Sequence, residues 1–189
     1  MKKWMALILV LALAMTAAAC GCQKQPMSST GTTEATDNKG KAKTLTGTME
    51  ENINKIVAEN PAEFMGGMIP LDLKDTSEEG VWALKSYTGL DSAEKITDAA
   101  AYEPMTGSQA FSLVLVRVTD AADAQDVARQ MKTNIDPAKW ICVSADQVLA
   151  AGYGDVVMFV MLNANLGKTA QSYVDAFEKI CGSKPDFTI

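Results

Sequence analysis

The sequence predicts an α+β fold with two layers, in which helices pack on one face of a mostly antiparallel sheet. Three observations predict this class. Residues 110–118 (AFSLVLVRV) and 155–162 (DVVMFVML) are short runs of large apolar residues, as in buried strands. Residues 119–137 and 173–181 repeat apolar residues at helical spacing. The two glycines of residues 151–154 (AGYG) permit a tight hairpin, which joins antiparallel strands.

The first predicted element of the folded domain is a helix. Thr48 and Glu51 have the spacing of a capping box, which marks the start of a helix. One face of the helix is apolar, with Met49, Ile53, Ile56 and Val57. Residues 60–67 (NPAEFMGG) predict a second, short helical piece, with Asn60 as its cap and Gly66 as its end.

The middle of the chain predicts three short elements. Residues 81–89 (VWALKSYTG) are interpreted as a strand, and residues 90–96 (LDSAEKI) as a short helix capped by Asp91. Residues 98–105 (DAAAYEPM) predict an extended stretch that is broken at Pro104.

The second half of the domain predicts the centre of the sheet. Residues 110–118 are apolar on both faces, so we expect a central strand covered by helices on at least one side. A helix follows, capped by Asp120 and ended by Asp136 and Pro137. Residues 139–150 (KWICVSADQVLA) predict a further strand.

The last predicted element is a helix that ends at Gly182. Its apolar stripe consists of Tyr173, Val174, Phe177, Ile180 and Cys181. Residues 49–189 contain no repeat at a fixed period, so we expect them to form a single α+β domain.

The first 19 residues have the organisation of an export signal. A basic start (MKKW) precedes an apolar core (MALILVLALAM) and the small residues TAAA. The small residues before Cys20 resemble the lipobox of bacterial lipoproteins, in which the thiol is lipidated and becomes the mature N-terminus. Ala17 departs from that pattern, because leucine is usual there.

Other interpretations of this segment remain open. Cys22 is the poorer candidate for lipidation, because Cys20 would then stand among the small residues before the cut. The segment from Trp4 to Cys20 is 17 residues long, at the lower limit for a helix that spans a bilayer. A metal or redox site made by the two cysteines alone would be incomplete, since two thiolates need further ligands.

Residues 20–48 predict a lipidated cysteine followed by a disordered polar tether, because Ser, Thr, Gly and Lys dominate them. Residues 1–48 carry six Lys against two acidic residues, a net charge of +4. Residues 49–189 carry eleven Lys or Arg against twenty-one Asp or Glu, a net charge of −10. The domain should therefore be repelled by phosphate backbones, which excludes nucleic acid as an expected partner.

Candidate catalytic groups are few. The chain has no histidine, so catalysis would depend on carboxylates, Ser, Lys, Tyr or Cys. Ser92 and Lys95 have the S-x-x-K spacing of penicillin-interacting serine enzymes, but no S-D-N element accompanies them. We therefore interpret Ser92 as part of the first turn of a helix and not as a catalytic residue. We therefore do not expect the protein to be an enzyme.

Candidate metal ligands are equally weak. Met65 and Met68 could offer thioethers to Cu(I), although methionines more often fill a core. The acidic residues favour solvated loops and helix starts over ligands, because their spacing does not fit a calcium loop. These residues are Asp72, Asp75, Glu78 and Glu79, with Asp120, Asp123 and Asp126. We expect neither a metal nor a cofactor.

Cys142 and Cys181 are the other two cysteines. In an exported domain they could form a disulfide that joins the last helix to the sheet. The alternative is a pair of buried free thiols that behave as small apolar residues.

Four stretches of the domain resemble an uncharacterised domain family of lipoproteins from low-GC Gram-positive bacteria. They are GLDSAEKITDAAAYEPM, AFSLVLVRV, NIDPAKWICVSADQV and AGYGDVVMFVM, and the resemblance covers roughly residues 49–165. It implies the topology and the location, and it brings no active site.

The sequence therefore predicts a protein anchored by lipid at Cys20 to the outer face of the cytoplasmic membrane. We expect a non-enzymatic accessory module that binds an envelope protein. The alternative, from a different functional class, is a one-lobed lipoprotein that binds a small ligand or a metal and serves a transporter. A third, less favoured alternative is a hydrolase that acts on cell-wall material through carboxylates.

Overall fold

The computed structural model describes residues 43–189, and two long strands lie at its centre. They are β3 (Phe111–Val118) and β5 (Val156–Leu162), which pair antiparallel with Phe111 opposite Leu162. Every residue of β5 is buried, and in β3 only Arg117 is partly exposed. Strands buried on both sides need covering layers on both sides.

The sheet continues antiparallel on both sides of this pair, in the order β1-β2-β3-β5-β4-β6. Its other strands are β1 (Gly66–Pro70), β2 (Ile96–Pro104), β4 (Gln147–Tyr153) and β6 (Phe187–Thr188). Tyr153 pairs with Val156, so the β4–β5 hairpin turns through Gly154 and Asp155 alone. Gly154 has φ +56°, a conformation that favours glycine in such a turn.

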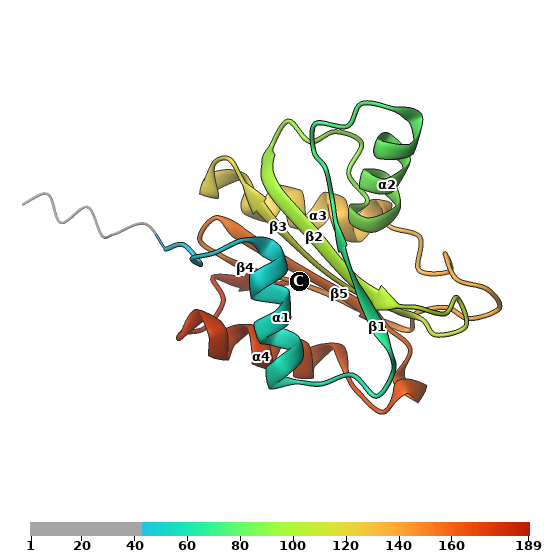
Figure 1. Ribbon diagram of the computed structural model, residues 1–189. Coiled ribbons are helices and arrows are strands. Elements are labelled where there is room, and N and C mark those ends of the chain that lie inside the picture. Colours follow the sequence, from blue (N-terminus) through green and yellow to red (C-terminus); the bar gives the residue numbers. More distant parts are fainter. Residues whose placement is uncertain (1–42) are drawn as a thin grey trace, which may run out of the picture. The chain divides into compact units, whose positions relative to one another are not determined.

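Helices cover both faces of the sheet (Figure 1). One face is covered by α1 (Met49–Glu59) and α4 (Ala170–Cys181). The other is covered by α2 (Glu78–Thr88) and α3 (Ala124–Asn134). The predicted α+β class and antiparallel sheet are confirmed, but the expectation of helices on one face is wrong. The described domain has three layers, because β3 and β5 are apolar on both faces.

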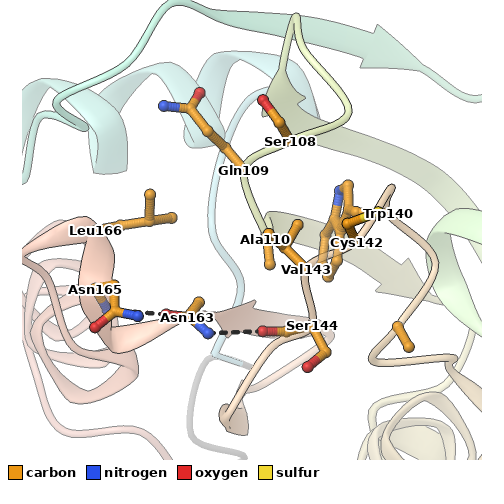
Figure 2. Close-up of a pocket in the computed structure, with 11 residues that line it drawn as sticks. Ser108, Gln109, Ala110, Trp140, Cys142, Val143, Ser144, Asn163, Asn165 and Leu166 are labelled. Carbon is orange, nitrogen blue, oxygen red and sulfur yellow. Dashed lines mark hydrogen bonds between the residues drawn. The ribbon is translucent and has the colours of Figure 1, made fainter.

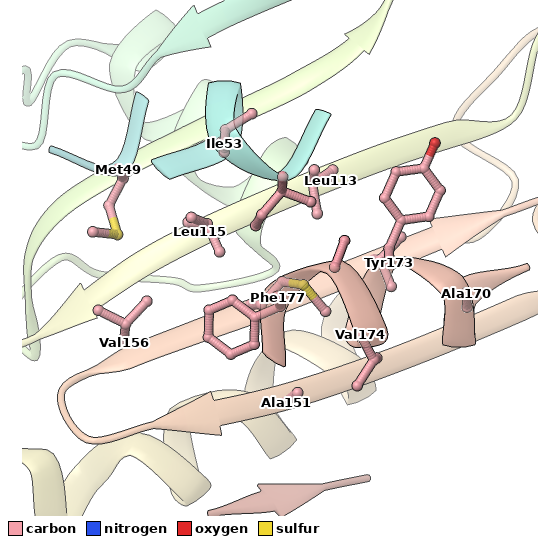
Figure 3. Packing of buried hydrophobic residues seen from close by; sticks show 14 of the residues in the cluster. Met49, Ile53, Leu113, Leu115, Ala151, Val156, Ala170, Tyr173, Val174 and Phe177 are labelled. Carbon is pink, nitrogen blue, oxygen red and sulfur yellow. The ribbon is translucent and has the colours of Figure 1, made fainter. Parts of the chain in front are cut away.

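Alternate residues of the central strands supply two separate cores. Figure 3 shows the core beneath α1 and α4, where Leu113 and Leu115 of β3 pack with Ile53 and Phe177. On the opposite face, Val114 and Val116 pack with α3, whose contributing residues are Ala124, Val127, Ala128 and Met131. Successive side chains of a strand point to opposite faces, so one sequence run serves both cores.

Local signals position the helix ends. Thr48 and Glu51 form the predicted capping box of α1. Asp120 caps a 3₁₀ turn, η1 (Ala121–Asp123), that leads into α3. Gly182 ends α4 in the left-handed conformation, as predicted.

Three predicted elements are wrong, and a fourth is right only in its last four residues. Residues 81–88 belong to the helix α2 rather than to a strand, and Gly89 is the C-cap of that helix. Residues 60–65 and 90–95 form no helix, and residues 139–146 form a loop before β4 begins at Gln147.

The domain begins earlier than predicted. Residues 43–47, expected to be the end of the tether, pack on the domain, and Leu45 is 8% exposed. Arg117 donates hydrogen bonds to the carbonyl oxygens of Leu45 (2.6 Å) and Gly47 (2.9 Å). Within residues 43–189, no helix combines the length and the hydropathy needed to cross a bilayer. The predicted leader and most of the tether lie outside the described residues.

Candidate functional site

A hollow of about 680 Å³ opens at the end of the sheet where β3 begins and β5 ends (Figure 2). Three segments line it, and we call it the sheet-end hollow. The segments contribute Ser108, Gln109 and Ala110, then Ala138, Trp140, Cys142, Val143 and Ser144, then Asn163, Asn165 and Leu166. Its volume is within the range of ligand pockets, roughly 300–1,000 Å³.

Backbone hydrogen bonds hold the three segments together. Ile141 donates its N–H to the carbonyl oxygen of Gly107 (2.8 Å), and Asn163 donates its N–H to that of Ala110 (2.9 Å). The Asn163 side chain makes the third connection, because its Nδ2 donates to the Ser144 carbonyl (2.9 Å). Its Oδ1 accepts from the Asn165 N–H (3.0 Å), so both ends of the Asn163 amide are bonded inside the wall.

The lining of the hollow is uncharged and combines polar with apolar side chains. None of the eleven lining residues is acidic or basic. Ser144 and Asn165 are held through their backbones, which leaves the Ser144 hydroxyl and the Asn165 amide available to a ligand. These groups can both donate and accept hydrogen bonds.

A buried ion pair supports the loop that carries Trp140 and Cys142. Lys139 Nζ lies 2.5 Å from Glu103 Oε1, and both side chains are only 12% exposed. Lys139 Nζ also donates to the Ser86 carbonyl oxygen (3.0 Å). It lies 4.9 Å from the ring centroid of Tyr87 and 5.5 Å from that of Trp140. The ion pair therefore connects the loop to both β2 and α2.

Burial affects the ionisation of this lysine. Burial lowers the pKa of Lys139, and the opposite charge of Glu103 acts against that shift. Because the Lys139 ammonium group is paired with the Glu103 carboxylate, the geometry gives Lys139 a structural role and leaves no free amine in the hollow.

Exposed apolar side chains lie beside the hollow. Met65, Met105 and Ile141 are 76%, 69% and 72% exposed, and we call them the apolar ledge. Met105 donates its N–H to the carbonyl oxygen of Met65 (3.0 Å), so these two residues are neighbours. Ile141 lies against Gly107, where an added Cβ would be 3.2 Å from Ile141 Cδ1. These contacts place the three exposed apolar side chains at the same end of the sheet, and exposed apolar surface of this kind is typical of an interaction site.

The two cysteines lie at different ends of the sheet. Cys142 is exposed in the hollow, with φ +60°. Cys181 is half-buried at the end of α4, near Asp186, which accepts a hydrogen bond from the Gly154 N–H at the β4–β5 turn (2.8 Å). Burial raises the pKa of the Cys181 thiol to about 12.

Both thiols are free, and their positions do not favour the predicted disulfide. The hollow adjoins Leu162 and the turn adjoins Val156, at opposite ends of β5. Seven strand residues span about 20 Å, whereas bridged cysteines need Cα atoms within roughly 7 Å. The prediction of two buried thiols also needs correction, because Cys142 is exposed.

The other predicted candidates do not assemble into a site. Lys95 pairs with Asp123 (2.8 Å) and Asp126 (3.2 Å), while the Ser92 hydroxyl accepts from the Glu94 N–H (3.3 Å). Asp123 and Asp126 raise the pKa of Lys95, whereas a general base needs a lowered pKa.

The candidate metal ligands also stay apart. Met65 is exposed, whereas Met68 packs on the core beneath α1 and α4. Asp72 and Asp75 accept hydrogen bonds from the backbone N–H groups of Lys74 and Ser77. Within residues 43–189, no three metal-ligating His, Cys, Asp or Glu side chains gather.

The chain enters the domain at the end opposite to the hollow. Arg117, which holds residues 43–47, pairs with Val156 at the far end of β3 and forms an ion pair with Asp155 (2.7 Å). Lys43 forms an ion pair with Asp186 (2.5 Å) beside the β4–β5 turn. About 20 Å of strand therefore separates this point of entry from the hollow.

Sequence reasoning did not find the hollow or the Lys139–Glu103 pair. The polar residues at 163–165, directly after a buried strand, were the available local signal. No such signal pairs Lys139 with Glu103, which is 36 positions away. Cys20, the predicted lipidation site, lies outside the described residues. Comparisons with family models, curated proteins and solved structures found no match to this chain.

Proposed function

We propose that this protein is a lipid-anchored, non-enzymatic accessory module on the outer face of the cytoplasmic membrane. Its partner would be an envelope protein that packs on the apolar ledge of Met65, Met105 and Ile141. The observation that carries the proposal is the position of the ledge, at the opposite end of the sheet from the entry of residues 43–47. A tether that joins the domain at that entry is attached about 20 Å from the ledge, so a flexible tether leaves the ledge accessible to a partner.

The sequence supports the anchor and the physical chemistry supports the ledge. The export signal and Cys20 are the features that predict lipidation. Two or more acyl chains give stable attachment, at about 0.8 kcal/mol per buried methylene. Exposed Met and Ile side chains gain free energy when a partner removes them from water, at about 25 cal/mol per Å² of apolar surface.

The anchor is tested by intact mass. Full-length protein extracted from membranes should begin at Cys20 and carry the added mass of acyl chains. The Cys20→Ala variant should lose that mass and leave the membrane fraction, whereas Cys22→Ala should keep both. An unmodified Cys20 in membrane-extracted protein would contradict the anchor.

The partner surface is tested by site-specific crosslinking in cells. A photoreactive amino acid replaces Ile141 in the ledge and, as the matched control, the exposed Lys184 near Asp186 at the other end. We expect one envelope protein to be crosslinked from position 141 and not from position 184. Crosslinking of the same protein from both positions, or from neither, would contradict a partner on the ledge.

The sheet-end hollow favours a second candidate function, a one-lobed lipoprotein that binds a small ligand. Its volume of about 680 Å³ and its unused polar side chains carry this candidate. A ligand that binds the folded state should raise the melting temperature of the full-length protein, according to RT ln(1 + [L]/Kd). The absence of any such shift across a panel of small molecules would leave the accessory module as the function.

A further inference from the structure

We infer that the sheet-end hollow is a binding site for an uncharged saccharide. The inference rests on the second candidate function and gives it a ligand class. Three independent properties of the hollow point to such a ligand: its lack of charge, the kind of polar groups that it presents, and the way in which its wall is held in advance.

The absence of charge in the lining selects an uncharged ligand. Charged residues make up 21% of the chain, and the folded part is strongly acidic, yet all eleven lining residues are neutral. An anionic ligand would meet no cation in the hollow and would be repelled by the domain as a whole. A cationic ligand would meet no carboxylate there, so it would lose hydration without an opposite charge.

The polar groups of the hollow match the hydroxyl groups of a sugar. A hydroxyl donates one hydrogen bond and accepts two, so it needs partners that do both. The side chains of Ser108, Ser144 and Asn165 offer that combination, and Gln109 adds an amide whose Oε1 already accepts a hydrogen bond from the Thr106 hydroxyl (3.4 Å). Trp140, which also packs on the core beneath α3, adds an aromatic side chain to the same wall, and a sugar ring has apolar C–H surfaces as well as hydroxyls.

The wall of the hollow is organised before any ligand arrives. Asn163 bonds both to Ser144 and to Asn165, and the Lys139–Glu103 pair holds the loop from behind. A site held in its binding geometry loses less conformational entropy when a flexible, polar ligand binds. This smaller entropy loss matters for saccharides, because each of their hydroxyls exchanges a hydrogen bond with water for one with protein and gains little free energy by it.

Binding is measured by titration calorimetry on the full-length protein in detergent. The neutral probes are maltotriose, which carries only hydroxyls, and N,N′,N″-triacetylchitotriose, which adds acetamido groups. Trigalacturonate is the charged counterpart. We expect at least one neutral trisaccharide to bind with a Kd of about 1 mM or below, and trigalacturonate to bind at least tenfold more weakly.

Two matched variants locate the binding site. Asn165→Ala removes an exposed amide from the hollow, and Asn134→Ala removes an exposed amide from the end of α3. Loss of ligand hydrogen bonds should weaken binding about tenfold in Asn165→Ala and leave Asn134→Ala unchanged. Circular dichroism confirms that both variants are folded. A second readout is Cys142, whose labelling by a maleimide should slow when the neutral trisaccharide is present.

Two results would overturn the inference. One is that neither neutral trisaccharide binds the folded protein below about 10 mM. The other is that Asn165→Ala binds as tightly as Asn134→Ala while Cys142 stays equally reactive. Neither result touches the proposed anchor or the apolar ledge, because intact mass and crosslinking from position 141 test those separately.

Discussion

Lys139 and Glu103 depend on each other, because each is 12% exposed and each compensates the other's charge. Removing one partner leaves an uncompensated buried charge, so Lys139→Met or Glu103→Gln should lower the free energy of unfolding by about 3–5 kcal/mol. Replacing both by apolar residues, as in Lys139→Met with Glu103→Leu, should cost less than either single change. Urea denaturation of the purified protein measures all three values.

The exposed pair of Lys85 and Asp91 provides the control for this prediction. Its side chains are 61% and 72% exposed, so Lys85→Met should change the free energy of unfolding by at most about 1 kcal/mol. If Lys139→Met were equally mild, the buried pair would have no structural role in the wall of the hollow.

Cys181 predicts a dependence of stability on pH. Burial raises the pKa of its thiol from 9.0 to about 12, so the folded chain keeps a proton that the unfolded chain releases. Between those values the folded state binds more protons, and stability falls as the pH rises. One proton gives at most about 1.4 kcal/mol per pH unit, and solvent screening of this half-buried group makes the effect smaller.

The measurement compares the native chain with Cys181→Ala by urea denaturation at about pH 8 and about pH 10. The native chain should lose more of its free energy of unfolding over that interval than the variant does. Groups such as Lys139 titrate in both chains, so they cancel in the comparison. Equal losses would show that the thiol is not protected by burial.

The redox state of the two domain cysteines follows from their separation. Cys142 and Cys181 lie at opposite ends of the sheet, so we expect no bridge between them. Protein unfolded in the absence of reductant should be alkylated at both positions, and peptide mass spectrometry reads each one separately. A peptide pair joined through Cys142 and Cys181 would contradict the arrangement of the strands.

At the scale of elements, Gly152 shows how a close approach sets the C-terminal edge of the sheet. It lies within β4 opposite Phe187 of β6, and an added Cβ would be 2.2 Å from the Phe187 ring. Gly152→Ala should therefore displace β6 and lower the free energy of unfolding by about 1–3 kcal/mol. Hydrogen exchange should also show lost protection of the Ile189 N–H, which bonds to Ala150 (2.8 Å).

Gly182→Ala is the matched control for Gly152→Ala. Gly182 has φ +71° and no atom within 4 Å of an added Cβ, so the substitution meets only backbone strain of about 1 kcal/mol. It should leave the Ile189 N–H protected. Loss of that protection in both variants would mean that β6 responds to general destabilisation and not to the contact with Phe187.

Elements whose local and tertiary signals agree could be predicted from the sequence. The capping box of α1, the Gly182 end of α4 and the apolar runs of β3 and β5 are all found where expected. In each case the residues that favour the element also supply its buried face.

Two of the failed predictions, the strands at residues 81–89 and 139–146, share a physical cause, because their apolar residues are exposed and not buried in a sheet. Val81 and Trp82 are exposed on α2, and the helix is started by Ser77, whose side chain accepts from the Gly80 N–H (3.2 Å). Ile141 and Cys142 suggested a strand, but Ile141 is exposed and Cys142 adopts φ +60°. The hollow arises where this loop meets residues distant in sequence, which periodicity does not reveal.

At the scale of the whole molecule, the two central strands determine both the layers and the ends. Both strands carry apolar residues on both faces, so both faces of the sheet need a covering layer of helices. A prediction of helices on one face alone is therefore inconsistent with the sequence of these strands. Their length also separates the entry of the chain from the hollow and the apolar ledge. The entry of the chain lies beside Arg117, and the hollow and the apolar ledge lie at the other end.

If the protein is anchored at Cys20 as proposed, this separation predicts how it responds to a shorter tether. As a flexible coil, the 20 residues from 23 to 42 would span roughly 22–27 Å, which gives both ends of the domain access to solvent. Deleting residues 23–42 should bring the Arg117 end against the headgroups. The opposite end remains about 20 Å farther from the membrane, so the hollow stays open to solvent.

Membrane-impermeant maleimide on intact protoplasts measures this, in a Cys22→Ala background. Cys142 reports on the hollow, and Lys184→Cys reports on the other end, two residues before Asp186. With the full tether both thiols should be labelled at similar rates. With residues 23–42 deleted, labelling of Lys184→Cys should slow severalfold while Cys142 is unaffected, because only the Arg117 end is held near lipid. If Cys142 slowed equally, the hollow would face the membrane, and a saccharide outside it could not be the ligand.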